Sequence, residues 1–364
     1  MAPAPVAVDD VDVEISGHSE NLAIAVTDPS VVRTSPKVSS GELLLIDAST
    51  GGVVGRVSVD TGLQMHAALA DASDQLMVAH ATEKDSGRIL RIDVRSGEVL
   101  AVSEIPQPWG SPAGLNASEL LLDPSEAYLV LAHFVRAPDE TSDSSTRHEF
   151  AVSLISATDL SVIDTYKPAG CADGRLSSTM TDLAVFVACP DASNVQSIPY
   201  SERGFDALGV ETASTNGKGS VVVPADNADE AAGVVNRVRA ALKGMPFERE
   251  PLDVIVAERE LLAEAVPGDG QDLYVARRDL SENRALVNDV LVRMNIDTGE
   301  VLATRRFSEI GTRIRSFSYA DGRLLTVAED GRSVSLLDAM TLEELDSWTI
   351  ANLQTPLGYI TAGR

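Results

Sequence analysis

The chain of 364 residues carries 55 acidic and 29 basic residues, which gives a formal net charge of −26. This charge would repel a phosphate backbone, so nucleic acid is excluded as an expected partner. Hydrophobic residues make up 44% of the chain, enough for a sizeable core, yet no apolar run approaches the roughly 18 residues that a membrane-spanning helix needs.

The predicted elements begin with two apolar runs at 11–16 and 22–26, separated by a turn at 17–20. A hairpin follows at 41–59 (GELLLIDASTGGVVGRVSV), where Ser49-Thr50-Gly51-Gly52 forms the turn between two runs rich in β-branched residues. The first unit therefore predicts four short strands, A to D, joined as two hairpins.

The same four-strand unit returns along the chain. Pairs of runs like the first recur at 64–80 and 118–133, and single runs like the B strand recur at 183–189, 272–277 and 324–329. Hairpins like the second recur at 88–104, 150–164, 291–304 and 333–349. Four-stranded units of about 40 to 50 residues are typical of propeller blades, each of which buries its faces against its neighbours. We expect an all-β fold in which residues 1–364 form a single β-propeller domain of four-stranded antiparallel blades.

The number of blades depends on residues 215–258. Residues 220–223 and 253–257 indicate strands, but 229–244 (DEAAGVVNRVRAALKG) has apolar residues at helical spacing, an acidic start and a final glycine. This region is either a degenerate blade, which gives seven blades, or a helix-containing insertion in a six-bladed ring. We predict seven blades, closed by pairing of 355–363 with 5–8.

The turn phrases IDASTGGVV, IDVRSGEVL and NIDTGEVL, with the B-strand phrases LYVAR and LMVAH, resemble the repeats of YVTN-type propellers. That superfamily, which is WD40-like in architecture, includes the heavy subunits of quinoprotein amine dehydrogenases and the propeller lactonases. The resemblance covers most of the chain, but it lies at blade-forming positions. It therefore implies the fold far more strongly than an activity.

Cys171 and Cys189 are the two cysteines of the chain. If a strand from about 173 to 179 pairs with 183–189, residue 171 lies nearly opposite residue 189, within reach of a disulfide. An intrablade bridge is also implied by the resemblance to amine dehydrogenase heavy subunits; the alternative is two unpaired thiols. A disulfide would indicate an oxidising compartment.

The Ala- and Pro-rich start lacks a signal peptide but is similar to that of a mature exported protein, so we expect an extracellular or periplasmic location.

Polar residues at the ends of the B strands predict a functional face. His80, His133, Cys189, Arg277 and Glu329 follow Val-Ala or similar pairs at one repeat position. The D–A loops open on the same face as the B–C loops, and they carry or adjoin His66, Trp109, Arg278, Arg313 and Arg315. A propeller mouth lined in this way is the default place for a ligand or a partner.

Each of these residues also has a purely structural interpretation. A histidine at a strand end usually bonds a neighbouring loop, and Trp109 is more often a packing aromatic than a ligand platform. The acidic clusters at 9–14 and 71–74 lack the loop spacing of an EF-hand. We therefore predict neither a metal site nor a bound cofactor in this chain.

Three functions fit the sequence. The first is an exported scaffold that binds a protein or small ligand at the channel mouth. The second is a heavy-subunit role like that in quinoprotein amine dehydrogenases, where a separate small subunit holds the redox cofactor. The third is a lactonase-like hydrolase using His66, His80 or His133 with nearby arginines. No standard catalytic signature is present, so the sequence assigns no catalytic residue.

Overall fold

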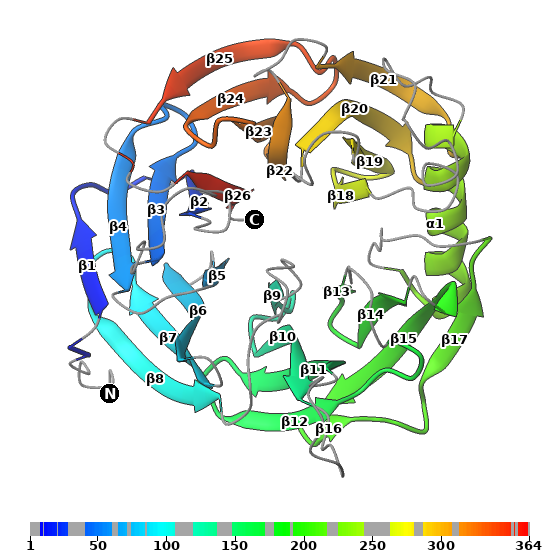
Figure 1. Ribbon diagram of the computed structural model, residues 1–364, viewed down its shortest axis with the longest axis horizontal. Coiled ribbons are helices and arrows are strands. Elements are labelled where there is room, and N and C mark those ends of the chain that lie inside the picture. The colour runs from blue at the N-terminus through cyan, green and yellow to red at the C-terminus, as the bar shows by residue number, and fades with distance from the viewer. Residues whose placement is uncertain are drawn as a thin grey trace, which may run out of the picture.

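The repeated turn phrases fold as the outer hairpins of antiparallel sheets, and the computed structural model arranges these sheets as six blades around one axis (Figure 1). The structure describes residues 8–9, 11–19, 21–27, 41–59, 65–70, 74–83, 86–105, 119–136, 148–171, 178–189, 192–216, 225–243, 263–279, 287–307, 313–350, 353 and 356–362. Six blades correct the prediction of seven and agree with its alternative.

Blades 2 to 6 follow the predicted order, with strand A nearest the axis and strand D at the rim. Blade 2 contains β5 (Met65–Ala70), β6 (Gln75–Glu83), β7 (Ser86–Asp93) and β8 (Val99–Ile105). Blade 3 contains β9 (Glu119–Leu122), β10 (Tyr128–Arg136), β11 (His148–Ser156) and β12 (Val162–Tyr166). Blade 4 contains β13 (Ser178–Met180), β14 (Ala184–Cys189) and β15 (Asn194–Ser201), with β16 (Gly204–Phe205) and β17 (Glu211–Ser214) both paired to β15 at its outer edge.

The last two blades share one ladder. Blade 5 contains β18 (Ala263–Pro267), β19 (Asp272–Asp279), β20 (Val287–Asn295) and β21 (Val301–Arg306). Blade 6 contains β22 (Ile314–Ala320), β23 (Arg323–Ala328), β24 (Ser333–Asp338) and β25 (Glu344–Thr349). A backbone pairing of Asn288 with Ile314 joins β20 to β22, and among the described residues no other two blades are joined in this way.

Blade 1 departs from the prediction at both edges. Its innermost strand is the C-terminal β26 (Leu357–Ala362), which pairs with β2 (Leu22–Thr27). The predicted pairing with residues 5–8 falls on a segment that, except for Val8, lies outside the described residues. The order then runs through β3 (Gly41–Asp47) and β4 (Val53–Val59) to β1 (Val11–Ile15), the outermost strand, which was predicted as strand A.

The side chains of blade 1 explain this exchange of edges. β1 alternates apolar residues with exposed Asp12 and Glu14, as suits a rim strand with one solvated face. β26 carries no charged residue, and Leu357 and Ile360 are buried. The strand nearest the axis is enclosed on both faces, so burying the carboxylates of β1 there would be costly. The two ends of the chain therefore contribute opposite edges of one blade.

The predicted helix is α1 (Ala228–Lys243), which lies between blades 4 and 5 at the rim (Figure 1). Asn227 caps its start, since its Oδ1 accepts a hydrogen bond of 2.9 Å from the backbone N–H of Glu230. Glu230 in turn accepts one of 2.9 Å from the N–H of Asp226, the residue before the cap, so the helix start is held by two reciprocal bonds. The strands predicted at 220–223 and 253–257 lie outside the described residues.

Both sides of α1 are buried against blades. Ala231 and Val235 pack with blade 4, and Val234 and Val238 pack with blade 5. In the part of the chain that the structure describes, one apolar cluster fills each of seven gaps, namely those between blades 1 and 2, 2 and 3, 3 and 4, 4 and α1, α1 and 5, 5 and 6, and 6 and 1. The ring therefore has seven packed sectors, of which α1 is one.

The C–D turn is the most regular feature of the blades. In five blades the N–H of its fifth residue donates to the carbonyl of its first over 2.7–2.9 Å, and the fifth residue has a φ of 60–74°. The first and fifth residues are Asp47 and Gly51, Asp93 and Gly97, Ser156 and Leu160, Asn295 and Gly299, and Asp338 and Leu342. Glycine suits this left-handed position, whereas the two leucines occupy it while buried in clusters between blades.

Three sectors each donate an arginine hydrogen bond to the C–D turn of the next blade. Arg91 of blade 2 donates to the carbonyl of Ala157 in blade 3 over 3.1 Å, and Arg293 of blade 5 donates to that of Met340 in blade 6 over 3.3 Å. Arg237 of α1 makes the corresponding bond, of 2.6 Å, to the carbonyl of Ile296 in blade 5. The helix thus supplies both the packing and the polar contact of a preceding blade.

Candidate functional site

The antiparallel order gives the ring two different faces. A–B and C–D turns lie at one end of the strands, called here the turn face, and B–C and D–A connections lie at the other, called here the loop face. The sequence-predicted site residues that the structure describes belong to the loop face. Trp109 lies outside the described residues, and for His66, Arg277 and Arg278 only the position of the backbone is described.

The ladder register defines one position at the loop-face end of every B strand. In five blades this position is the fifth residue after the one that pairs with the first residue of the C–D turn, and it holds Thr27, His80, His133, Arg277 and Ala328. In blade 4 the position is assigned to Cys189, because its side chain packs toward blade 3. Glu329, predicted at this position, comes one residue later. The backbones of the six positions correspond, and their side chains differ.

The structure does not bring His80 and His133 together. Leu76 and Val78 of β6 face blade 1, so by alternation His80 faces blade 1 as well. Leu129 and Leu131 of β10 face blade 2, and His133 follows them. Both imidazoles are buried, and the sheet of blade 2 stands between them. Among the described residues no group of three or more His, Cys, Asp or Glu side chains could hold a metal ion.

His133 belongs to a chain of hydrogen bonds that crosses blade 3. Its Nε2 lies 2.8 Å from the hydroxyl of Ser153, and that hydroxyl lies 2.8 Å from the hydroxyl of Thr165. The three residues come from β10, β11 and β12, so the chain runs outward toward the rim. A buried polar network of this kind holds strands in register. In blade 1, Thr27 bonds both backbone groups of Glu42 on the next strand.

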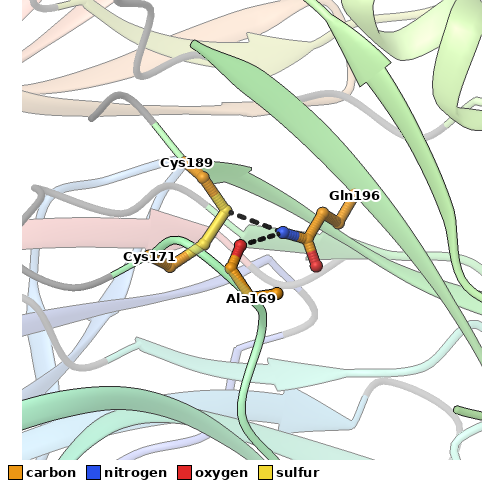
Figure 2. Close-up of a disulfide and its surroundings, with 4 residues drawn as sticks. All are labelled: Ala169, Cys171, Cys189 and Gln196. Carbon is orange, nitrogen blue, oxygen red and sulfur yellow. Dashed lines mark hydrogen bonds between the residues drawn. A yellow bond between two sulfur atoms is a disulfide. The ribbon is translucent and has the colours of Figure 1, made fainter. Parts of the chain in front are cut away.

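The predicted disulfide between Cys171 and Cys189 is present, with Cα atoms 5.0 Å apart (Figure 2). The register argument behind it was wrong, since β13 places Ser178 opposite Val187 and Cys171 lies outside the strands. Cys171 belongs to the connection between blades 3 and 4. The amide of Gln196 donates to the carbonyl of Ala169 over 2.6 Å, so this hydrogen bond and the disulfide both anchor the connection on blade 4 (Figure 2). The same amide donates to Cys189 Sγ over 3.6 Å within blade 4.

Arg313 and Arg315 flank the start of β22, where blades 5 and 6 join. The N–H of Glu329 donates to the carbonyl of Arg313 over 2.7 Å, and Arg315 Nε donates to the carbonyl of Glu329 over 2.7 Å. Both arginines are half-buried. The backbone of Glu329 therefore fixes the two arginines against the B–C turn of blade 6.

The carboxylate of Asp330 organises that turn. It accepts hydrogen bonds of 2.8 and 2.9 Å from the N–H groups of Arg332 and Ser333 and one of 2.8 Å from the Ser333 hydroxyl. Burial acts to raise the pKa of Asp330, but these donors and the charge of Arg315 outweigh it, so the pKa lies below its usual value. Asp330 is thus held as an anion beside Arg315.

Sequence reasoning missed Arg306, which ends β21 at the same junction. Val290 pairs with Arg277 on one side and with Arg306 on the other, so the three residues stand in one row across blade 5. The signal was present, because the predicted D strand ending at residue 304 continues directly into Arg305 and Arg306. Counting the register through to the loop face would have placed Arg306 in the row of Arg277.

No family model matches the chain, and no curated protein matches it. Among solved structures it is similar to the periplasmic gluconolactonase PpgL of Pseudomonas aeruginosa, with a TM-score of 0.53 and 14% identity over 94% of this chain and 99% of that one. It is also similar to a Bacteroides uniformis protein provisionally named a 6-phosphogluconolactonase, with a TM-score of 0.55 and 10% identity over 94% and 99% of the two chains. At these identities the likeness shows the propeller fold alone.

Proposed function

We propose that this protein is an exported binding propeller that engages a protein or a small ligand at the loop face, around the ring axis. The observation that carries the proposal is the difference between the two faces. The turn face repeats one C–D turn in five blades. The equivalent B-strand ends of the loop face carry six positions with five different residue types. Strand ends that are held differently in each blade can carry loops of different shape and charge around the axis, and such loops are where binding residues are commonly found.

The disulfide supports an exported setting, since such bonds persist in oxidising compartments. The periplasmic origin of PpgL agrees with it. No helix in the described part of the chain is long and apolar enough to cross a membrane.

Native mass spectrometry of the protein purified from its own host without reductant tests the proposal. We expect a co-purifying small molecule or subunit, and hydrogen exchange of the intact complex should show protection at strand ends of the loop face, such as 186–189 and 313–316. The same comparison at the turn-face residues 93–98 is the control. A bound species that protects the turn face and leaves the loop face unchanged would contradict the proposal.

A lactonase-like activity is the second candidate, because both structural neighbours above carry gluconolactonase names. The separation of His80 from His133 excludes a site formed by these two histidines, so either of them would have to act without the other, for example with arginines. The rate of hydrolysis of a sugar lactone, measured against pH for the wild type and for His80→Gln, distinguishes a lactonase from a binding scaffold. A scaffold gives no rate above the uncatalysed reaction, whereas a catalytic histidine gives a pH-dependent limb that the variant loses. A heavy-subunit role would instead appear as a small cofactor-bearing subunit in the mass spectrum.

A further inference from the structure

The D strand begins with a β-bulge in five blades, and the residue at the bulge is apolar in all five. It follows the first paired residue of the D strand, so two residues of this strand oppose one residue of the C strand. The bulge residues of blades 1, 2, 3, 5 and 6 are Val54, Leu100, Ile163, Leu302 and Leu345. An apolar residue that recurs at the rim of the ring indicates a place where something packs.

In blade 1 a fifth strand covers the bulge. β1 pairs with the outer edge of β4, and the N–H groups of Ser16 and Gly17 at its end donate to the carbonyl of Val54 over 2.8 and 3.1 Å. Opposite charges meet across this pairing, since Glu14 stands opposite Arg56. Val54 is half-buried. The fold itself therefore accepts one more strand beyond strand D.

In blade 3 a segment of the next blade covers the bulge. Ile163 packs against the cluster between blades 3 and 4, and Phe205 of β16 packs against the same cluster. The N–H of Phe205 donates to the carboxylate of Asp164 over 3.0 Å, and its ring lies beside that of Tyr166, with centroids 6.1 Å apart. Ile163 is half-buried as well. β1 and β16 thus cover the same position in two different blades.

Blades 5 and 6 leave this position exposed. Leu302 is 43% exposed and Leu345 is 54% exposed, and Met340 in the C–D turn of blade 6 is 58% exposed. β25 is the outermost strand of blade 6, and no described strand pairs with its outer edge (Figure 1). The edge that β1 covers in blade 1 is therefore open in blade 6, with an exposed leucine at its start.

Carboxylates surround Leu345 on this open edge. Glu343, Glu344 and Asp346 adjoin it in the chain, and all three are exposed. Arg305 of blade 5 bonds Glu344 over 3.2 Å, and no other arginine or lysine in the described part of the chain bonds these carboxylates. β25 contains no basic residue, whereas β21 ends with two arginines. Of the two exposed bulges, the one in blade 6 thus lies on the acidic edge.

We propose that the outer edge of β25 binds an extended segment of a partner protein, which adds to blade 6 as β1 adds to blade 1. An added strand pairs with the backbone of an open edge, and its side chains give specificity. β4 carries Arg56 and pairs with the acidic β1, so the acidic β25 fits a segment that alternates apolar residues with lysine or arginine. A second copy of the chain is a poor occupant, because two chains of charge −26 repel each other. This edge is separate from the loop face, so the inference does not rest on the proposed function.

Fluorescence anisotropy of the full chain with a labelled peptide tests the inference. The peptide alternates valine with lysine over about nine residues, the length of a typical long strand. We expect it to bind at micromolar concentration, and the same peptide with glutamate in place of lysine to bind at least tenfold more weakly. The sharper comparison methylates alternate backbone nitrogens of the valine–lysine peptide, which keeps the charge but removes the strand hydrogen bonds and should also weaken binding at least tenfold. Equal binding of the methylated peptide, or no binding of the parent peptide, would overturn the inference.

Substitutions then locate the peptide. Asp346→Lys should weaken binding of the valine–lysine peptide at least tenfold, and Leu345→Ser should weaken it by a smaller factor. The matched controls lie on blade 4, where Glu202→Lys makes the same charge change at an exposed residue and Leu208→Ser removes a leucine that is 98% exposed. Both controls should leave the affinity nearly unchanged, and thermal melts of each variant verify folding. Controls that weaken binding as much as the β25 variants would show attraction to the acidic surface in general and would overturn the inference.

Hydrogen exchange separates this inference from the proposed function. The bound peptide should slow exchange at 344–349 and leave 301–306 of β21 unchanged; slower exchange at 301–306 alone would assign the peptide to blade 5 and overturn the inference. A homodimer that Asp346→Lys abolishes would assign the edge to a second copy, which also overturns it. A host ligand that protects 186–189 and 313–316 supports the proposed function whatever the peptide does, so either proposal can fail while the other stands.

Discussion

At the turn face, five blades repeat the same hydrogen-bonded C–D turn, and each turn is covered by the sector before it. At the loop face, the corresponding B-strand ends carry threonine, two histidines, cysteine, arginine and alanine. Both faces are formed by the same strands, so the difference does not arise from the backbone. It indicates that the turn face holds the ring together through one repeated hydrogen-bonded turn, whereas the loop face is stabilised by contacts that differ from blade to blade.

The largest effect is expected at a glycine of the turn face. Gly51 has a φ of 70°, and a methyl group there would overlap the indole of Trp348 on β25. Gly51→Ala should combine the left-handed strain of about 1–2 kcal/mol with an overpacking cost of about 1–3 kcal/mol. Chemical unfolding should therefore give a loss of about 3 kcal/mol in the free energy of unfolding.

Gly322→Ala is the matched control for that substitution. Gly322 has a φ of 71°, and an added methyl group there meets nothing within 4 Å. It should cost only the strain, about 1 kcal/mol. Equal losses for the two variants would mean that the contact of Trp348 with the C–D turn of blade 1 contributes nothing to ring closure.

The disulfide is the strongest individual contact expected at the loop face. It closes a loop between residues 18 positions apart, so replacing Cys171 and Cys189 together by alanine should lower the free energy of unfolding by about 3 kcal/mol. Amide exchange should rise at 169–171 and 194–196, which the bond and Gln196 hold together, and stay unchanged at the turn face. Faster exchange throughout the ring would show instead that the bond supports the whole closure.

A smaller effect is expected from the hydrogen-bond chain of blade 3. Ser153→Ala removes the hydroxyl that links His133 to Thr165 and should cost about 1–2 kcal/mol, since polar groups buried around it lose a partner. Ser161→Ala, at an exposed turn of the same blade, serves as the control and should stay within about 0.5 kcal/mol of the wild type. If the two variants are equally stable, the chain from His133 does not hold blade 3 in register.

The comparison of the faces also explains what could be predicted from the sequence. The hairpin phrases predicted the blades because the turn needs an oxygen-bearing side chain or a glycine at fixed positions, as at Asp93 and Gly97. The helix was predicted because its cap and apolar spacing are local. The blade number was not, because α1 replaces a blade only through its packing on Phe186 and Val275, which is a tertiary fact.

The ring closure and the site depend on contacts distant in sequence. β1 and β26 both appear as short apolar runs, and only the carboxylates of Asp12 and Glu14 distinguish the rim strand from the axial one. The site residues were found at their strand ends, but which of them meet depends on side-chain alternation. His80 and His133 have equivalent positions and therefore face different gaps. The backbones of Arg277 and Arg306 stand in one row across blade 5, because Val290 pairs with both.

The smallest effect is a pH dependence that belongs to the repeated turn itself. The N–H and hydroxyl of Thr341, with the N–H of Met340, hold the pKa of Asp338 below its usual value, and Arg293 adds to this. A carboxylate whose pKa is lower in the folded state stabilises the fold above its unfolded pKa of 3.8, and this stabilisation is lost as the pH falls through the folded value. Asp338→Asn should keep the turn at neutral pH, because Asn295 accepts the same pair of backbone bonds in blade 5. Its unfolding free energy should therefore fall less steeply than that of the wild type between about pH 5 and about pH 2. An unchanged slope would mean that the carboxylate charge adds nothing to what the amide oxygen already provides, and that the repeat at the turn face is maintained by hydrogen-bond geometry alone.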